Sequence, residues 1–196
     1  MNHLAHLYLA GDDEERIVGQ ILGDFLEPGW RQRASAGVIA AVAEHQSIDV
    51  FTDEHPVVVR GRRRLDPPLR RFGGILLDVF FDHFLACRWR EFSPDTPLEE
   101  FTGSRYAVLS RRREWLTMRL ARALPAMARD DWLASSRTIE GVEATLARIA
   151  AMLSRPTPLP MGAELLRRER ANWEADFDAF FPELLDRFGE RRQPNR

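Results

Sequence analysis

Apolar residues recur every three or four positions along most of the chain, which is the spacing of one face of an α-helix. No segment alternates apolar and polar residues as a half-buried strand does, so the pattern predicts an all-α fold. The clearest series are Val18, Ile21, Leu22 and Phe25; Val38, Val42, His45 and Asp49; Ile139, Val142, Leu146, Ile149 and Leu153; and Trp173, Phe177, Phe180, Leu184 and Phe188.

The segment 74–89 is apolar on nearly every side of the predicted helix, so we expect it to be buried. Asp78, Asp82 and His83 interrupt it. Asp78 and Asp82 are four residues apart and share one helix face, whereas His83 joins the neighbouring stripe. Burying two carboxylates and an imidazole is costly unless they are paired or bind a metal, and a cation is the simplest compensation.

Short proline and glycine breaks separate the predicted helices, and none is long enough to be a linker between domains. Residues 1–188 are therefore expected to form a single helical domain, and the polar tail 189–196 is expected to fray. Thr96 is predicted to begin a capping box, and Thr138 to cap the helix that follows it.

The composition is typical of a soluble globular protein, with 196 residues of which 44% are hydrophobic and 30% charged. No apolar run is long enough to span a membrane, and the N-terminus lacks the features of a signal peptide. We therefore expect a cytoplasmic location without membrane insertion. The single cysteine, Cys87, excludes a disulfide within the chain and a cysteine zinc cluster.

Every basic side chain other than histidine is arginine, and arginines cluster at 60–71 and again at 111–113. Such clusters suit an acidic partner or a phosphate-bearing substrate, although a solvated face is the plainer explanation. Nucleic-acid binding is disfavoured because the arginines lack interleaved aromatic residues and the net charge is −2.

Ionisable residues from at least four segments lie in apolar surroundings. Each is weak evidence alone, because a lone inward histidine is usually a satisfied core residue. Together they would be a large structural liability, which a shared metal centre would explain. The set is His6, Asp24, His45, Asp49, Asp78, Asp82 and His83.

This mixture of imidazole and carboxylate, without thiolate, suits manganese, iron, zinc or magnesium. Such a centre can lower the pKa of a bound water and neutralise charge on a phosphoryl oxygen, so the predicted reaction class is hydrolysis of a phosphate ester. The sequence has no glycine-rich phosphate loop and no Gly-x-Ser-x-Gly elbow, which argues against a nucleotide triphosphatase or a serine hydrolase.

Segments 1–10, 19–25, 45–53 and 77–85 resemble bacterial acyl carrier protein phosphodiesterase, also called acyl carrier protein hydrolase, and 173–182 fits as well. The resemblance implies a helical bundle distantly related to HD-type metal phosphohydrolases. It also implies that manganese is the cofactor and that 4'-phosphopantetheine is removed from a serine of acyl carrier protein. The usual HD pattern runs His, then His-Asp, then Asp, whereas the doublet here is reversed and follows the other candidates. We therefore carry over positions and not individual roles.

On this resemblance, we expect the metal to activate water for attack at the phosphodiester phosphorus. Asp49 and Asp78 are expected to complete the metal shell, orient a histidine or act as general base. His6 is expected to bind the metal or to protonate the leaving serine oxygen. Asn2 is expected to hydrogen-bond the phosphate, and a simple helix cap explains it equally well. The ligands expected first are Asp24, His45, Asp82 and His83.

Acyl carrier proteins are small and acidic, so Arg62, Arg63 and Arg64 are predicted to steer and orient this partner. Two other functions stay open. A metal phosphohydrolase acting on a small nucleotide needs the same centre but no docking surface. A non-catalytic module that binds the carrier protein needs only a structural polar core, and it would lose no stability on chelation.

Overall fold

The computed structural model describes residues 3–189, which are helical along most of their length and contain no strand. The predicted all-α fold is confirmed. The first elements are α1 (His3–Leu9), α2 (Glu14–Leu22), η1 (Gly23–Phe25), η2 (Trp30–Gln32), α3 (Ala36–Glu54), α4 (Pro56–Arg64), α5 (Pro67–Arg70) and α6 (Gly73–Cys87). They are followed by α7 (Trp89–Phe92), α8 (Leu98–Arg111), η3 (Arg113–Trp115), α9 (Met118–Arg129), α10 (Trp132–Ser135), α11 (Ile139–Met152), η4 (Leu159–Met161), α12 (Gly162–Arg168) and α13 (Arg170–Phe188).

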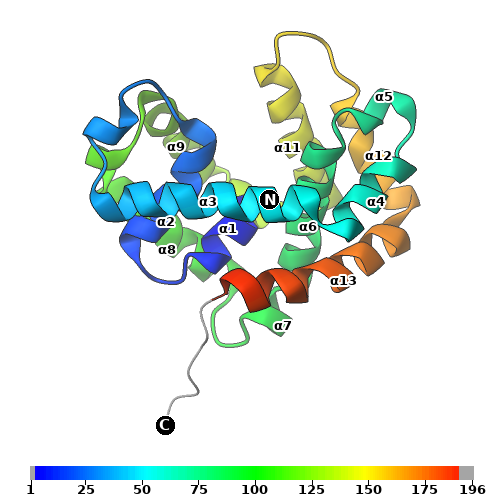
Figure 1. Ribbon diagram of the computed structural model, residues 1–196, viewed down its shortest axis with the longest axis horizontal. Helices are drawn as coiled ribbons and strands as arrows, with labels where there is room; N and C mark the ends of the chain where they lie inside the picture. Colours follow the sequence, from blue (N-terminus) through cyan, green and yellow to red (C-terminus); the bar gives the residue numbers. More distant parts are fainter. Residues whose placement is uncertain (1–2, 190–196) are drawn as a thin grey trace.

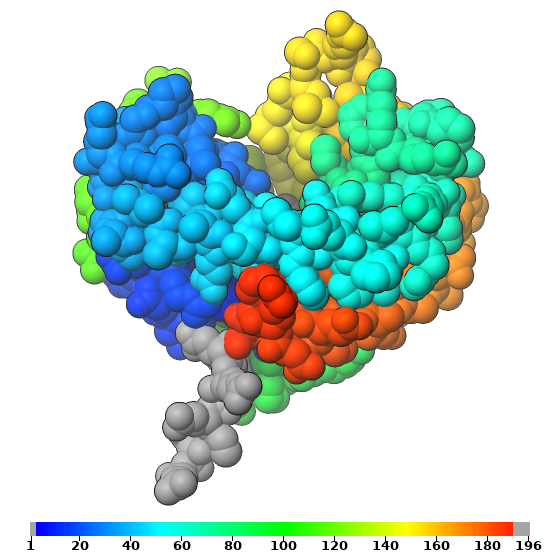
Figure 2. Space-filling model, in the orientation of Figure 1, coloured from blue at the N-terminus to red at the C-terminus, as the bar shows by residue number. Residues whose placement is uncertain are grey.

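The long helix α3 crosses the front of the molecule, with α1, α2, α8 and α9 towards one end and α4, α5 and α12 towards the other (Figure 1). α6 passes behind α3, and α13 runs along the lower edge. The molecular surface is hollowed between the lobe that carries η1 and η2 and the lobe that carries α11 (Figure 2). No described helix is both long and apolar enough to cross a membrane.

One continuous set of buried apolar side chains connects the longer helices, and within it α6 packs against α1, α4, α11 and α13. Phe80 and Phe81 are fully buried. Their ring centroids lie 5.5 Å from Trp173 and 5.2 Å from Phe180, both on α13. The predicted burial of the helix at 74–89 is therefore confirmed, although the helix ends at Cys87.

Two glycines allow α2 and η1 to approach α3 closely. A Cβ at Gly19 would lie 2.3 Å from the Cβ of Ala41, and a Cβ at Gly23 would lie 2.2 Å from the Cδ2 of His45. Real Cβ atoms do not come this close to other atoms, so only glycine fits at either position. Gly23 therefore makes the space that the His45 ring occupies.

The two predicted caps have different outcomes. The hydroxyl of Thr138 accepts a hydrogen bond from the Gly141 N–H at 3.1 Å, so this cap is confirmed. The capping box at Thr96 is wrong, because α8 begins after Pro97 without a side-chain cap. The Thr96 carbonyl accepts a hydrogen bond from Trp89 instead. Asn2 and the tail beyond Gly189 lie outside the described residues.

Candidate metal centre

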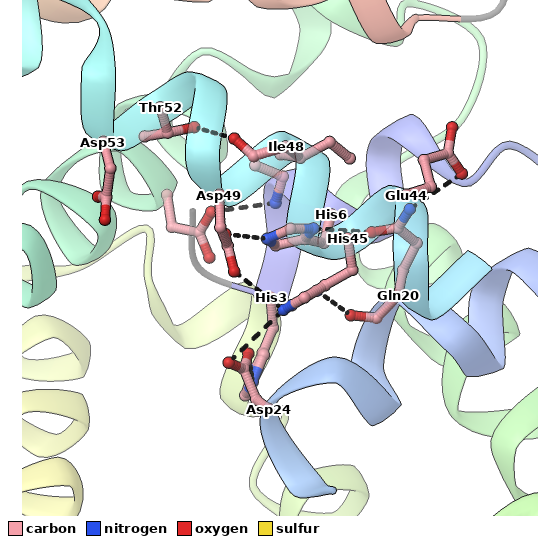
Figure 3. A network of polar contacts seen from close by, with 12 residues as sticks. His3, His6, Gln20, Asp24, Glu44, His45, Ile48, Asp49, Thr52 and Asp53 are labelled. Carbon is pink, nitrogen blue, oxygen red and sulfur yellow. Dashed lines mark hydrogen bonds and ion pairs between the residues drawn. The ribbon is translucent and has the colours of Figure 1, made fainter. Parts of the chain in front are cut away.

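Three side chains from two helices point towards one another (Figure 3). His6 comes from α1, and His45 and Asp49 lie one turn apart on α3. The Nε2 atoms of His6 and His45 each lie 3.1 Å from an Asp49 oxygen, Oδ1 and Oδ2 respectively. The two rings stack with centroids 4.0 Å apart. One ligand atom from each residue lies within 4.8 Å of the others, close enough for one ion to contact all three.

Gln20 fixes which nitrogen of each histidine faces Asp49. The Nδ1 of His45 lies 2.8 Å from the main-chain carbonyl oxygen of Gln20, which can only accept a hydrogen bond. The Nδ1 of His6 lies 2.8 Å from the side-chain Oε1 of the same residue. Both Nδ1 atoms therefore carry the proton, and both Nε2 lone pairs point at one carboxylate. Three acceptors that face each other in this way need a proton or a cation between them.

The orientation of the Gln20 amide is fixed in turn. Its Nε2 donates to Glu44 at 3.1 Å, so its Oε1 is the atom left for His6. The Glu44 carboxylate accepts hydrogen bonds from the Arg16 guanidinium at 3.0 and 3.2 Å. This chain of contacts is the kind of outer-shell support that commonly orients metal-binding histidines.

Asp24 extends the cluster towards the surface. Its Oδ2 lies 3.0 Å from the Nε2 of His3, and its Oδ1 lies 3.8 Å from the Nε2 of His45. The side chain is 43% exposed, whereas His6 is fully buried. Asp24 is therefore accessible from the surface, as is Asp49 at 39% exposure.

The electrostatics of the cluster keep its two carboxylates ionised. Burial would raise the pKa of Asp49, but its contacts with His45 and His6 hold that pKa well below its usual range. Burial would also raise the pKa of Asp24, but the nearby histidines, His3 above all, outweigh it and lower that pKa to about 2. Asp24 and Asp49 are thus anionic at neutral pH, as metal ligands must be.

The pKa values of the two histidines in the cluster shift in opposite directions. Burial lowers the pKa of His6 to about 4, so its imidazole is neutral. Burial also acts to lower the pKa of His45, but the hydrogen bond to Asp49 and the charge of Asp24 outweigh it and raise that pKa. His45 therefore retains a second proton to higher pH than an ordinary histidine does, and a bound metal ion would displace that proton.

A pocket of about 330 Å³ opens beside this cluster, and the acidic face of α6 forms part of its wall. Asp24, Asp78 and Asp82 all line it, so the predicted shared face of the two α6 carboxylates is confirmed. A larger pocket of about 430 Å³, which includes Tyr8 and Arg105, contains none of the predicted site residues.

Asp82 is buried as predicted, but main-chain groups compensate its charge. Its two oxygens accept hydrogen bonds from the N–H groups of Leu4 and Ala5 at 2.8 and 3.0 Å, which caps the first turn of α1. Burial nevertheless raises its pKa to about 7. Burial also raises the pKa of Asp78. Both carboxyl groups therefore favour the protonated form more than an ordinary aspartate does.

The structure does not bring His83 to the cluster. Its Nδ1 lies 2.8 Å from the carbonyl oxygen of Ser136, and its Nε2 lies 2.9 Å from the Arg170 guanidinium on α13. The helix α6 thus turns Asp82 and His83 towards different neighbours.

The three predicted docking arginines differ in their surroundings. Arg62 pairs with Asp53, and Arg64 pairs with the buried carboxylate of Asp176. Arg63 is exposed. Two of the three positive charges are therefore partly neutralised within the protein.

Three polar residues of the site are not among those predicted from the sequence. His3 stands one helical turn before His6, and this spacing was a usable signal. Gln20 lies among apolar residues of α2, where a buried amide requires a specific partner. Glu44 is beside His45 in the sequence, but only the packing of α2 on α3 brings it to Gln20.

Comparisons with known proteins identify the family of the chain. A sequence model of the family described as acyl carrier protein phosphodiesterase matches residues 1–184. A protein of that name from Escherichia coli O45:K1 (strain S88 / ExPEC) is 33% identical over 195 residues, covering 96% of this chain and 92% of the relative. Another of the same name, from Photorhabdus laumondii subsp. laumondii, is 26% identical over 187 residues, covering 95% and 94%.

No solved structure matches the chain, so the distant relation to HD-type phosphohydrolases stays a prediction. The family match covers nearly the whole chain, and the resemblance seen in the sequence is confirmed. The chain therefore belongs to the acyl carrier protein phosphodiesterase family and is a hydrolase.

Proposed function

We propose that this protein is a metal-dependent phosphodiesterase that hydrolyses the bond between 4'-phosphopantetheine and a serine of holo-acyl carrier protein. The products are apo-acyl carrier protein and 4'-phosphopantetheine. The observation that carries the metal dependence is the pair of histidines whose Nδ1–H groups both donate to Gln20. This arrangement leaves two Nε2 lone pairs facing Asp49. The name shared by the relatives supports the substrate.

His6, His45 and Asp49 would hold the ion, and Asp24 would complete the set at the pocket side. Two imidazoles and two carboxylates suit Mn²⁺ well, and Mg²⁺, Fe²⁺ and Zn²⁺ are compatible with the same donors. A divalent ion bound there supplies a nucleophile at neutral pH and offsets negative charge on the phosphoryl oxygens.

Asp78, His3 and His6 have separate roles in the proposed reaction. Asp78 lines the pocket, and burial raises its pKa, so we assign it the proton that neutralises the leaving serine oxygen. His3 is hydrogen-bonded to Asp24 and keeps that carboxylate oriented. His6 is fully buried and neutral, which favours its role as a ligand over a role as proton donor.

An arginine-lined surface next to the pocket suits the acidic carrier protein. Arg62, Arg70 and Arg71 line a shallow depression that shares Ile75 with the pocket of about 330 Å³. Their positive charges would steer an acidic protein towards the opening and slow its escape at low ionic strength.

The test is incubation of the purified protein with holo-acyl carrier protein and Mn²⁺, followed by mass spectrometry of the carrier. We expect loss of the 4'-phosphopantetheine group, abolished by chelation and by His45→Gln. The matched control is His55→Gln, because His55 is buried but pairs with Glu183 outside the cluster. An intact carrier in the presence of bound Mn²⁺ would contradict the proposal, and hydrolysis of a small nucleotide by the same sample would favour the nucleotide phosphohydrolase instead.

A further inference from the structure

The pocket beside the candidate metal centre has two unlike walls. His3, Asp24, Asp78 and Asp82 line one side, and α9, α10 and α11 provide a mostly apolar wall with two arginines. We propose that this second wall binds the 4'-phosphopantetheine arm and that Arg148 holds its phosphate. The proposal rests on the proposed function, because the arm is the part of that substrate that is released.

Arg148 is a half-buried cation with hydrogen-bonding capacity to spare. Its Nη2 donates to the Thr145 hydroxyl at 2.8 Å, and its guanidinium carbon lies 4.3 Å from the centroid of the Trp132 ring. Among the described residues, no carboxylate makes an ion pair with it. A guanidinium has five N–H donors in a planar fork, and phosphate is the anion that this fork matches.

A second arginine, Arg119, lines the same wall. The guanidinium carbon of Arg119 lies 5.8 Å from the centroid of the Phe25 ring, and its main-chain N–H donates to Glu27 at 3.2 Å. Arg119 and Asp24 line the same pocket. A phosphate in this pocket therefore has basic side chains on one side and the candidate metal centre on the other, as a phosphodiester substrate requires.

The rest of the pocket lining suits the chemistry of the arm, which carries methyl and methylene groups and two amides. The volume of about 330 Å³ falls within the range of about 300–1,000 Å³ seen for small-molecule pockets. Met152 is 67% exposed at the end of α11, so it forms an apolar rim where the arm would enter. The apolar lining is Phe25, Ile75, Val79, Ala123, Trp132, Leu133, Ile149 and Met152.

Calorimetric titration of the full chain with the product 4'-phosphopantetheine tests this without turnover, because the product is no longer a diester. The Mn²⁺-loaded wild type is compared with Arg148→Gln, with Ala123→Phe, and with Arg122→Gln as the control at an exposed arginine outside the pocket. Pantetheine, which lacks the phosphate, is titrated in parallel. Thermal melts establish that each variant is folded.

Arg148→Gln should lose about tenfold or more in affinity for 4'-phosphopantetheine and less than about twofold for pantetheine. Ala123→Phe fills the pocket and should weaken both ligands by similar factors, whereas Arg122→Gln should change neither. Unchanged binding of 4'-phosphopantetheine by Arg148→Gln, or equal loss for both ligands, would overturn the assignment. Failure of holo-carrier hydrolysis alongside the expected binding pattern would refute the proposed function and leave this subsite standing.

Discussion

Replacing Gln20 tests the central feature of the candidate metal centre without touching a ligand. Gln20→Met keeps the length of the side chain but removes the Oε1 that accepts from His6 at 2.8 Å and the Nε2 that donates to Glu44 at 3.1 Å. His45 keeps its partner, because that partner is the main-chain carbonyl of the same residue. The substitution therefore releases only one of the two histidines.

The expected loss follows from that difference. Removing an outer-shell hydrogen bond to a metal-binding histidine costs about 10- to 100-fold in metal affinity, or about 1.4–2.7 kcal/mol. Since one of two histidines is affected, we expect about tenfold. The buried Nδ1–H of His6 is also left without a partner, which should lower the free energy of unfolding by about 1–3 kcal/mol.

Calorimetric titration of the metal-free protein with MnCl₂ measures the affinity, and urea denaturation measures the stability. The matched control is Gln46→Met, because Gln46 is an exposed glutamine on the same helix as His45. The role of Gln20 in orienting His6 is refuted if Gln20→Met binds Mn²⁺ as tightly as the wild type does, or if Gln46→Met weakens binding to the same extent.

Three further predictions concern space, protons and charge. Gly23→Ala should lower Mn²⁺ affinity by at least about tenfold in calorimetric titration, because its Cβ would displace the His45 ring. The control is Gly103→Ala, whose new Cβ has nothing within 4 Å and which should bind Mn²⁺ as the wild type does. Wild-type affinity in Gly23→Ala would contradict the role of Gly23 in placing the His45 ring. Mn²⁺ affinity should rise with pH above the ordinary pKa of histidine, because the ion competes with the proton that the raised pKa of His45 retains. An affinity without pH dependence would exclude that competition. Arg64→Gln should lower the free energy of unfolding by about 2 kcal/mol in urea denaturation, because it leaves the buried Asp176 with only the longer 3.8 Å contact to Arg60, whereas exposed Arg63→Gln should change it by less than about 0.5 kcal/mol. Equal stabilities of these two variants would be inconsistent with the ion pair.

The sequence predicts helices and their inward faces well, because both depend on local spacing. Asp78 and Asp82 share a pocket wall since residues four apart share a helix face. His45 and Asp49 meet for the same reason. The contact of His6 with Asp49 joins residues 43 positions apart, and no local pattern determines how α1 crosses α3.

The ionisable groups buried on α6 have partners within the protein. Burial of Asp82 requires compensation, and the N–H groups of Leu4 and Ala5 provide part of it. His83 is likewise satisfied by Ser136 and Arg170. Periodicity reveals that a polar group is buried, whereas the identity of its partner depends on which elements pack against it.

Anomalous diffraction at the manganese absorption edge, from crystals of the protein grown with Mn²⁺, tests the location of the metal most directly. We expect one strong peak between the Nε2 atoms of His6 and His45 and the carboxylate of Asp49, with Asp24 on its pocket side. A peak beside His83, or active crystals without a peak at this cluster, would contradict it.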